Sequence, residues 1–315
     1  MDLANLRVVA LGHSSAGKST YLAAMFTHLA AGRKGFRMVT ADRGTADQLI
    51  ASGKQLAKGV YPPPTSRSTD LEAGLEYGRK ELLGFHWADY RGGALTSSAA
   101  DDPETRKLLK RLTRADAVVV FADAHRLATD PDSHDEVRRT VVLLHRAVGD
   151  DQSTPLPIVL AYTKSDLVTD PADWARARAA TAPLEELLGS GGRVRGAVVA
   201  VSCGRSPRAV AVPVLWCLST LLGHRARQAE ERLAEAKEFV KDLRKEANGI
   251  DSLVSWFKGV ESAAKRLRFW EEELRESKEE VAGLRRPAQR LARLLEREQR
   301  GSAPPAGASA PAVTR

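Results

Sequence analysis

A glycine-rich segment between two apolar stretches constrains the fold of this chain more than any other feature. Residues 12–19 read GHSSAGKS, the spacing of a loop that binds phosphate groups. Before it, LRVVAL at 6–11 is apolar and rich in β-branched residues, as in a buried strand. After it, apolar residues recur at three- and four-residue steps, which is helical spacing. The sequence therefore predicts a strand, a phosphate-binding loop and a helix in succession.

Each part of this loop has an expected role. Its glycines let the backbone curl with N–H groups facing an anion, and the positive end of the following helix adds to that field. We expect Lys18 to reach the β- and γ-phosphates and the Ser19 hydroxyl to bind Mg²⁺. The alternative, a glycine-rich turn with an unrelated lysine, does not account for the flanking strand and helix. The residues of the loop expected to bind the nucleotide are Gly12, Ser14, Ala16, Gly17, Lys18, Ser19 and Thr20.

Residues 1–222 alternate strand-like and helical patterns, which is typical of an α/β domain with a mostly parallel sheet and helices on both faces. A strand–helix unit is expected at 35–58, and the following YPPPT (61–65) favours an extended loop. Further strands are expected at 82–89, 117–123, 157–166 and 194–202. Further helices are expected at 103–114, 135–148, 172–188 and about 207–222.

The composition changes after about residue 224 to Glu, Lys, Arg, Ala and Leu, with apolar residues in 3-4 steps. The steps break at Asn248-Gly249, which predicts an antiparallel coiled-coil hairpin at 223–299. We expect Pro287 to kink or end its second arm. The low-complexity segment at 300–315 is expected to be a disordered tail. A coiled coil with no activity of its own is the favoured interpretation of the hairpin.

Composition excludes several classes of function. The formal net charge is +8, but the charges alternate in sign and aromatic residues make up only 5%, so we expect no nucleic-acid partner. The two cysteines, Cys203 and Cys217, form neither a disulfide framework nor a metal-ligand cluster. No apolar run is long enough to span a membrane, and no signal-peptide pattern opens the chain. The expected location is the cytoplasm.

Three short motifs follow expected strands. In Asp89-Tyr90-Arg91-Gly92, the aspartate can hold Mg²⁺ through a water, and the Gly92 N–H can bond the γ-phosphate. In Thr163-Lys164-Ser165-Asp166, the Asp166 carboxylate can accept two hydrogen bonds that guanine offers and adenine lacks, with the Lys164 stem over the base. At Ser202-Cys203-Gly204, backbone N–H groups can meet the guanine oxygen. The polar pair Asp123 and His125 is interpreted as surface or switch-rim residues.

The order of these motifs resembles the translation-factor-like class of GTPases with Ras-like topology, over residues 6–222. Within that class, the extra unit before PPPT and the first helix resemble bacterial double-GTPase-type domains. The resemblance implies GTP and GDP as ligands, Mg²⁺ as cofactor and a switch between two nucleotide-bound forms. It also implies that Thr65 closes on Mg²⁺ and the γ-phosphate, with Ser66, Ser68 and Thr69 competing for that role.

The chain departs from the pattern of that class at three positions. Gly93 stands where Ras-like enzymes carry a water-positioning glutamine, which puts that route of hydrolysis in doubt. Thr163 replaces the commoner asparagine, so an amide tie to the phosphate loop is lost. Ser15 stands where dynamin-like GTPases place a serine that helps to position water or a cation. Arg91 either reaches the γ-phosphate or faces solvent. The expected catalytic residues are Lys18, Ser15, Thr65 and Arg91.

Together these features predict a regulatory GTPase that hydrolyses GTP slowly and signals to a protein partner, or to a second copy, through residues 223–299. One alternative is a dynamin-like mechanochemical protein on membranes, for which Trp256-Phe257 is the one candidate lipid contact and support is otherwise lacking. The other is a nucleotide-binding adaptor with negligible turnover, which Gly93 favours. Single-turnover hydrolysis separates the adaptor from the enzyme.

Overall fold

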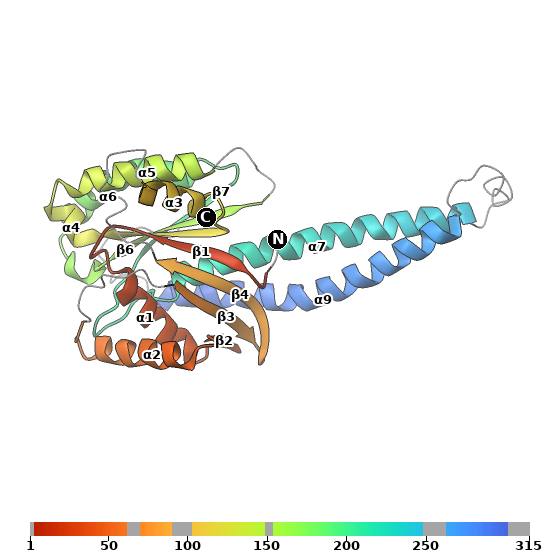
Figure 1. The fold of residues 1–315 in the computed structure, drawn as a ribbon, viewed down its shortest axis with the longest axis horizontal. Helices are drawn as coiled ribbons and strands as arrows, with labels where there is room; N and C mark the ends of the chain where they lie inside the picture. Colours follow the sequence, from red (N-terminus) through yellow and green to blue (C-terminus); the bar gives the residue numbers. More distant parts are fainter. Residues whose placement is uncertain (1–2, 62–69, 90–102, 149–153, 248–262, 302–315) are drawn as a thin grey trace. The chain divides into compact units, whose positions relative to one another are not determined.

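The computed structural model describes residues 3–61, 70–89, 103–148, 154–247 and 263–301. In these residues one seven-stranded sheet has the order β2-β3-β4-β1-β5-β6-β7 (Figure 1). The strands are β1 (Leu6–Leu11), β2 (Phe36–Val39), β3 (Asp70–Tyr77), β4 (Lys80–Asp89), β5 (Ala117–Asp123), β6 (Leu156–Thr163) and β7 (Val194–Ala200). The five strands from β4 to β7 in the sheet order run parallel, so their carboxyl ends meet at one edge.

The strands β2 and β3 pair antiparallel and extend the sheet at one side. The strand β3 is absent from the sequence-based expectation, which placed an extended proline loop before residue 66 and no strand until 82. Its apolar residues alternate as Leu71, Ala73 and Leu75, and these three are buried. It joins β4 through Gly78 and Arg79, whose φ angles of 60° and 68° suit a two-residue hairpin turn. The alternation and the glycine were the signal that sequence reading missed.

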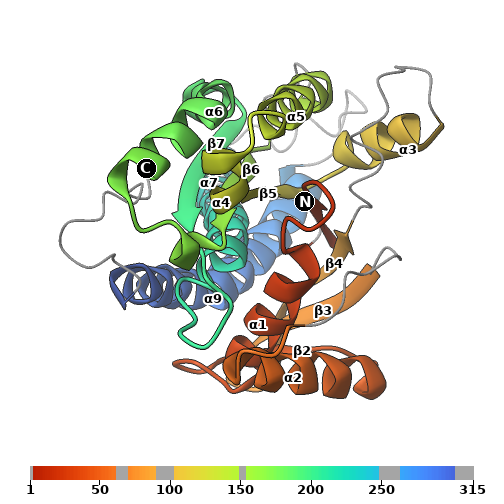
Figure 2. The same ribbon diagram turned by 90° about the vertical axis from the view of Figure 1, so that its left-hand side faces the viewer.

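Helices cover both faces of the sheet, as predicted (Figures 1 and 2). One face carries α3 (Pro103–Leu112), α4 (Ala124–Thr129), α5 (Ser133–Val148) and α6 (Pro171–Gly189). Their apolar residues form a buried cluster with the inner side chains of β1, β5, β6 and β7. The other face carries α1 (Lys18–Ala30) and α2 (Arg43–Ala57). There the Tyr21 ring lies 4.9 Å from Phe121 and 5.9 Å from Trp87, so α1 packs directly on β4 and β5.

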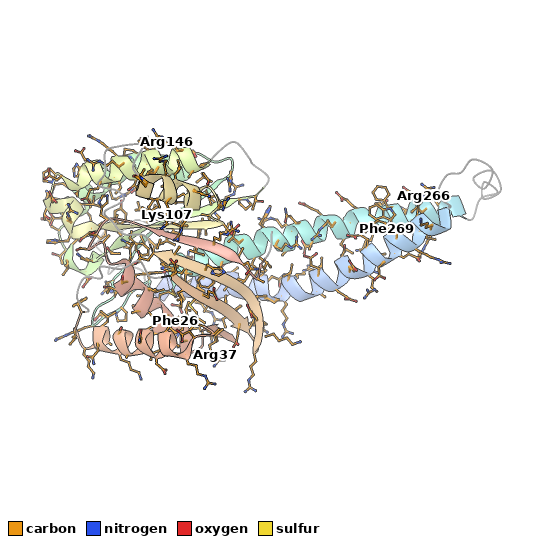
Figure 3. All side chains as sticks on the ribbon, in the orientation of Figure 1. Phe26, Arg37, Lys107, Arg146, Arg266 and Phe269 are labelled. Carbon is orange, nitrogen blue, oxygen red and sulfur yellow. The ribbon has the colours of Figure 1, made fainter. Side chains whose placement is uncertain are left out.

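The last two elements that the structure describes are long helices, α7 (Val212–Ala247) and α9 (Ala263–Gly301). The chain divides into two compact units, Met1–Leu221 with Leu291–Arg315, and Leu222–Arg290. Within the second unit the helices pack together and run antiparallel. Arg232 pairs with Glu280 at 2.7 Å and Arg244 with Glu271 at 2.8 Å. The exposed Phe239 ring stacks on Trp270 at 4.3 Å, and Phe269 projects from α9 beside it (Figure 3).

Four expectations about this region need correction or fall outside the described residues. The helix α9 continues through Pro287 to Gly301, so the proline does not end it, and residues 300–301 are helical rather than part of a tail. Loss of one backbone hydrogen bond at a proline costs about 3 kcal/mol, and burial of Leu291 and Leu294 beyond it offsets that cost. The expected turn at Asn248-Gly249 and the Trp256-Phe257 pair lie outside the described residues. No described helix is long and apolar enough to cross a membrane.

Candidate functional site

The candidate site lies at the edge of the sheet where the parallel strands end. The loop after β1 sits between the ends of β4 and β5, its two neighbours in the sheet. In the sheet order, the strands that precede β5 in the sequence lie on one side of β1, and the strands from β5 onward lie on the other. A crevice opens outside the carboxyl ends of the strands at such a position, which is the usual place for ligands in open α/β sheets.

Two glycines shape the loop after β1 for different reasons. A Cβ atom at Gly12 would lie 2.6 Å from the Phe121 carbonyl oxygen, so only glycine lets the loop pass close to β5. Gly17 has φ 84° and ψ 15° at the N-terminus of α1, a left-handed conformation that favours glycine. The exposed Ser15 also has a positive φ of 64°. The backbone is therefore curled around the start of α1, as a loop that binds phosphate requires.

The Lys18 ammonium is buried inside this loop. It donates hydrogen bonds to the carbonyls of Gly12 at 2.7 Å and His13 at 3.1 Å, and lies 3.7 Å from the Asp89 Oδ1. Burial lowers the pKa of Lys18, and the Asp89 carboxylate opposes that shift. Burial also raises the pKa of Asp89 to about 6, against the Lys18 charge and the Ser19 hydroxyl. Each charged group thus favours the ionised form of the other, against the effect of burial.

The residues expected to bind Mg²⁺ fit a hard cation. The Ser19 hydroxyl donates to Asp89 Oδ2 at 3.3 Å, so the two oxygen ligands are adjacent. The other carboxylate oxygen, Oδ1, is buried and accepts no hydrogen bond within the described part of the chain. No group of three or more His, Cys, Asp or Glu residues that could hold a metal occurs among those residues.

The second predicted motif lines a neighbouring hollow of about 350 Å³. The exposed Asp166, the end of β6 and Cys203 line it. Burial and the nearby Asp166 charge raise the pKa of Cys203 to about 12, so this thiol stays protonated. The Tyr61 ring also lines the hollow, and its hydroxyl oxygen lies 2.4 Å from where a Cβ at Gly204 would stand. Other residues that line it are Gly17, Thr20, Thr163, Lys164 and Leu167.

The substitution of threonine for asparagine at position 163 does not cut the connection to the phosphate loop. The Thr163 hydroxyl is buried and lies 2.8 Å from the Ala16 carbonyl oxygen and 3.2 Å from that of Ala122. A hydroxyl has one proton to donate, so we assign the hydrogen bond to the shorter contact, with the Ala16 carbonyl. The amide tie is lost as predicted, but a hydroxyl tie replaces it.

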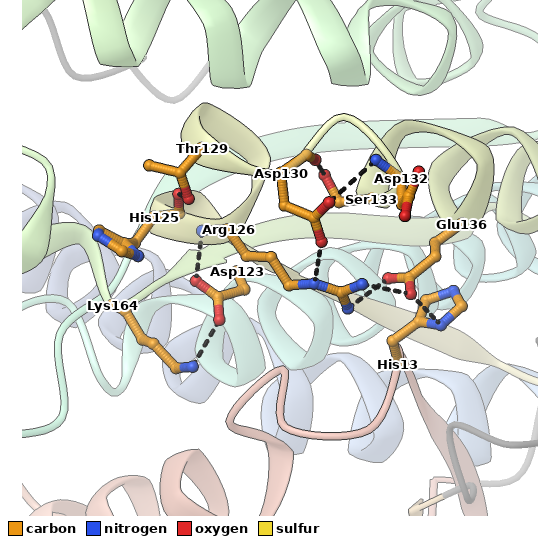
Figure 4. Close-up of polar contacts among 10 residues, drawn as sticks. All are labelled: His13, Asp123, His125, Arg126, Thr129, Asp130, Asp132, Ser133, Glu136 and Lys164. Atoms are coloured by element: carbon orange, nitrogen blue, oxygen red, sulfur yellow. Dashed lines mark hydrogen bonds and ion pairs between the residues drawn. The ribbon is translucent and has the colours of Figure 1, made fainter.

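A chain of charged groups joins the second motif to the phosphate loop (Figure 4). The Lys164 ammonium pairs with Asp123 Oδ2, while Asp123 Oδ1 accepts from the Arg126 backbone N–H at 3.1 Å and caps α4. The Arg126 guanidinium contacts Glu136 at 2.9 Å, and Glu136 lies 3.3 Å from His13 Nδ1. Residues on either side of β5 are thereby held in one network.

His13 occupies an unusual position in this network. Its side chain is buried beneath the loop, and Nε2 finds no hydrogen-bond partner among the described residues. Burial lowers the pKa of His13 to about 4, with Arg126 and Lys18 adding to the shift and Glu136 opposing it. Neutral imidazole is therefore the form at physiological pH.

Sequence reading missed this network. It took Asp123 for a surface or rim residue, but Asp123 is mostly buried and has two partners. The signal was available, since an aspartate directly after a strand and before a helical segment is a typical N-cap. Arg126 and Glu136 lie on helices, and no local pattern relates them to residue 13.

The structure places the remaining predicted residues as follows. Within the loop, Ser14 is exposed and Ala16 is buried. Ser202 is buried, and its hydroxyl donates to the Ser206 carbonyl at 2.9 Å, so its side chain shapes the loop rather than the hollow. The predicted residues Thr65, Arg91 and Gly92, with Ser66, Ser68, Thr69 and Gly93, lie outside the described residues.

One comparison with known proteins identifies the family of this chain. The family model Double-GTPase 2 matches residues 7–209. Among solved structures, the small GTPase Arl6 (BBS3) of Trypanosoma brucei, solved with a bound nucleotide analogue GppNp, is 16% identical, with a TM-score of 0.41. The alignment covers 69% of this chain and 98% of that one. No curated protein matches the chain. The resemblance to double-GTPase-type domains inferred from the motifs is thus confirmed, and because the family model spans more than half of the chain, the protein belongs to the Double-GTPase 2 family.

Proposed function

We propose that this protein binds GTP with Mg²⁺, hydrolyses it slowly and changes conformation between its GTP and GDP forms. The observation that carries the proposal is the convergence of two recognition elements at one edge of the sheet. A phosphate loop with buried Lys18 lies beside a hollow that Asp166 lines. Lys18 would oppose the charge of the β- and γ-phosphates, and Asp166 would accept hydrogen bonds from the guanine edge.

The proposed Mg²⁺ would be held by the Ser19 hydroxyl and by Asp89, directly or through a water, and by Thr65 if the resemblance carries over. Its chemistry is to neutralise charge on the phosphate oxygens. The chain's own residues keep the site ready for it. Ser19 orients the Asp89 carboxylate, and Lys18 holds that carboxylate ionised against the effect of burial.

The expected rate of hydrolysis is slow because Gly93 has no side chain to orient water. Ser15, exposed on the phosphate loop, and Arg91 are the residues we propose to assist. An arginine placed on the γ-phosphate accelerates hydrolysis by roughly 10³–10⁵. We propose that a partner, or a second copy that dimerises across the nucleotide face, supplies further acceleration. We also propose that residues 223–299 pass the conformational signal to the partner.

Specificity for guanine is tested by titrating GTP, ATP and xanthosine triphosphate into wild type and Asp166→Asn. Wild type should prefer GTP over ATP. Asp166→Asn should lose GTP affinity by about 2–4 kcal/mol and gain affinity for xanthosine triphosphate, whose C2 carbonyl accepts from an amide. Equal affinity of wild type for ATP and GTP would overturn the guanine assignment.

The phosphate site is tested separately with Lys18→Ala and Ser19→Asn. Lys18→Ala should remove triphosphate binding, and Ser19→Asn should reduce mainly the Mg²⁺-dependent part of GTP affinity. Single-turnover hydrolysis by wild type, Ser15→Ala and Arg91→Ala at several protein concentrations then measures turnover. One concentration-independent rate for all three would mean that neither residue assists and that a second copy does not. No turnover at all in wild type would favour the nucleotide-binding adaptor.

A further inference from the structure

A second pocket of about 360 Å³ lies within the first compact unit, away from the phosphate loop. Its walls come from the end of α1, the segment joining α1 to β2, the loop after β7 and the last turns of α9. Buried Leu294 holds α9 here, and Glu298 of α9 lies 3.1 Å from His28 of α1. Its volume is within the usual range for a small-molecule ligand.

The charges that line this pocket are strongly one-sided. Arg33, Lys34, Arg208 and Arg297 face it, against the single carboxylate of Glu298. That carboxylate is already engaged, because its hydrogen bond to His28 and the nearby Arg33 charge lower the pKa of Glu298. The side chains of Lys34, Arg208 and Arg297 have no carboxylate partner in the part of the chain that the structure describes.

The cations come from three separate segments, and because like charges repel one another, an anion between them would be stabilised. Two of the three unpartnered cations are arginines, whose planar guanidinium groups suit the oxygens of phosphate. The apolar part of the lining is small aliphatic side chains, and no Phe, Tyr or Trp lines the pocket to stack on a base. The lining therefore suits a ligand with negatively charged oxygen atoms rather than an aromatic base.

We propose that this pocket binds a small anion that carries two or more phosphate groups, as a site separate from the nucleotide site. The three cations without a carboxylate partner need more negative charge than one phosphate supplies, and the volume admits a second group. The donor of the phosphate groups is either a soluble compound or the headgroup of a phosphorylated lipid, since both present the same chemistry to the arginines.

The test is calorimetric titration of inorganic pyrophosphate into the full chain saturated with GDP and Mg²⁺, which keeps the probe out of the phosphate loop. Wild type should bind one equivalent. Arg208→Ala and Arg297→Ala should each weaken pyrophosphate binding about tenfold or more, the loss expected for one charge-assisted contact. Arg297→Lys keeps the positive charge but not the planar guanidinium that can donate two parallel hydrogen bonds. Its affinity for pyrophosphate should fall between those of Arg297→Ala and wild type.

The matched control is Arg293→Ala, an exposed arginine one turn earlier on α9 that does not line the pocket. It should bind pyrophosphate as wild type does. Equal weakening in Arg293→Ala and Arg297→Ala would mean diffuse attraction and would overturn the proposal, as would the absence of binding to wild type. A failure of the proposed GTP site can be told apart from a failure of this pocket. Pyrophosphate bound at the phosphate loop would not be weakened by Arg208→Ala or Arg297→Ala.

A second arm identifies the source of the phosphate groups. Wild type and the double variant Arg208→Ala/Arg297→Ala are sedimented with vesicles that contain phosphatidylinositol 4,5-bisphosphate. Co-sedimentation of wild type that the double variant loses supports a lipid headgroup as the ligand. Pyrophosphate binding without co-sedimentation supports a soluble phosphorylated compound. Vesicle binding that is equal in both proteins would argue against this pocket as the phosphate site.

Discussion

The hydrogen bond from Thr163 to the phosphate loop offers a direct test of how the two halves of the nucleotide site are joined. Thr163→Val replaces the hydroxyl by a methyl group of similar size, so the perturbation removes a donor without opening a cavity. The hydroxyl is 2.8 Å from the Ala16 carbonyl oxygen in a buried setting. Leaving that acceptor unsatisfied should lower the free energy of unfolding by about 2 kcal/mol.

The same change should weaken GTP binding, because Ala16 belongs to the loop that we propose binds the phosphates. If the tie stabilises the binding-competent loop by about 1.4 kcal/mol, GTP affinity falls about tenfold. Urea unfolding of the nucleotide-free protein measures the first effect, and calorimetric titration of GTP measures the second. The two readouts are independent, so a stability loss alone would separate folding from binding.

Thr163→Ser is the matched control, because it keeps the donor and removes only one methyl group, worth about 0.8 kcal/mol. It should retain GTP affinity near that of wild type. If Thr163→Ser weakens GTP binding as much as Thr163→Val, the methyl group rather than the hydrogen bond matters. If Thr163→Val has the stability and the GTP affinity of wild type, the hydrogen bond from Thr163 to Ala16 contributes to neither, and the reasoning is refuted.

Three further predictions follow from side chains around the site and in the hairpin. Asp123→Ala removes both the α4 cap and the partly exposed pair with Lys164, so it should lower the unfolding free energy by about 2 kcal/mol. Asp123→Asn keeps a capping oxygen and should cost about half of that loss in urea unfolding. His13 has a pKa of about 4 in the folded state against 6.5 when exposed, so the unfolded chain binds more protons between these values. Stability should therefore fall as pH drops from 6.5 to 4, and His13→Gln should flatten that part of the pH profile; an unchanged profile would contradict the burial argument. Phe239→Ala should destabilise the hairpin by about 1 kcal/mol in thermal unfolding followed by circular dichroism, and the double variant with Trp270→Ala should show coupling between the stacked rings.

The sequence alone was sufficient for the local parts of this protein. The strand–loop–helix of residues 6–29, the four later parallel strands and the antiparallel helices all follow from periodicity and from glycine spacing. These features depend on interactions between neighbours a few residues apart, so a local pattern carries them. The Thr163–Asp166 motif was recognised in the same way, since its residues are consecutive.

The elements that sequence reading missed depend on distant neighbours. The strand β3 forms because its alternate residues pair with β2 and β4, and its short apolar alternation is weak without those partners. Pro287 was expected to kink or end its helix, and the helix continues, because leucines buried beyond the proline outweigh one lost hydrogen bond.

Within the candidate site the residue types were predictable and their connections were not. Glycines, Lys18, Asp89 and Asp166 have chemistry that their motifs name in advance. The tie from Thr163 to Ala16 and the chain from Lys164 through Asp123 and Arg126 to His13 join residues up to about 150 positions apart. Only the packing of β5 between β1 and β6 brings these groups within hydrogen-bond distance, because the energy of a charged pair depends on separation in space and not on separation in sequence.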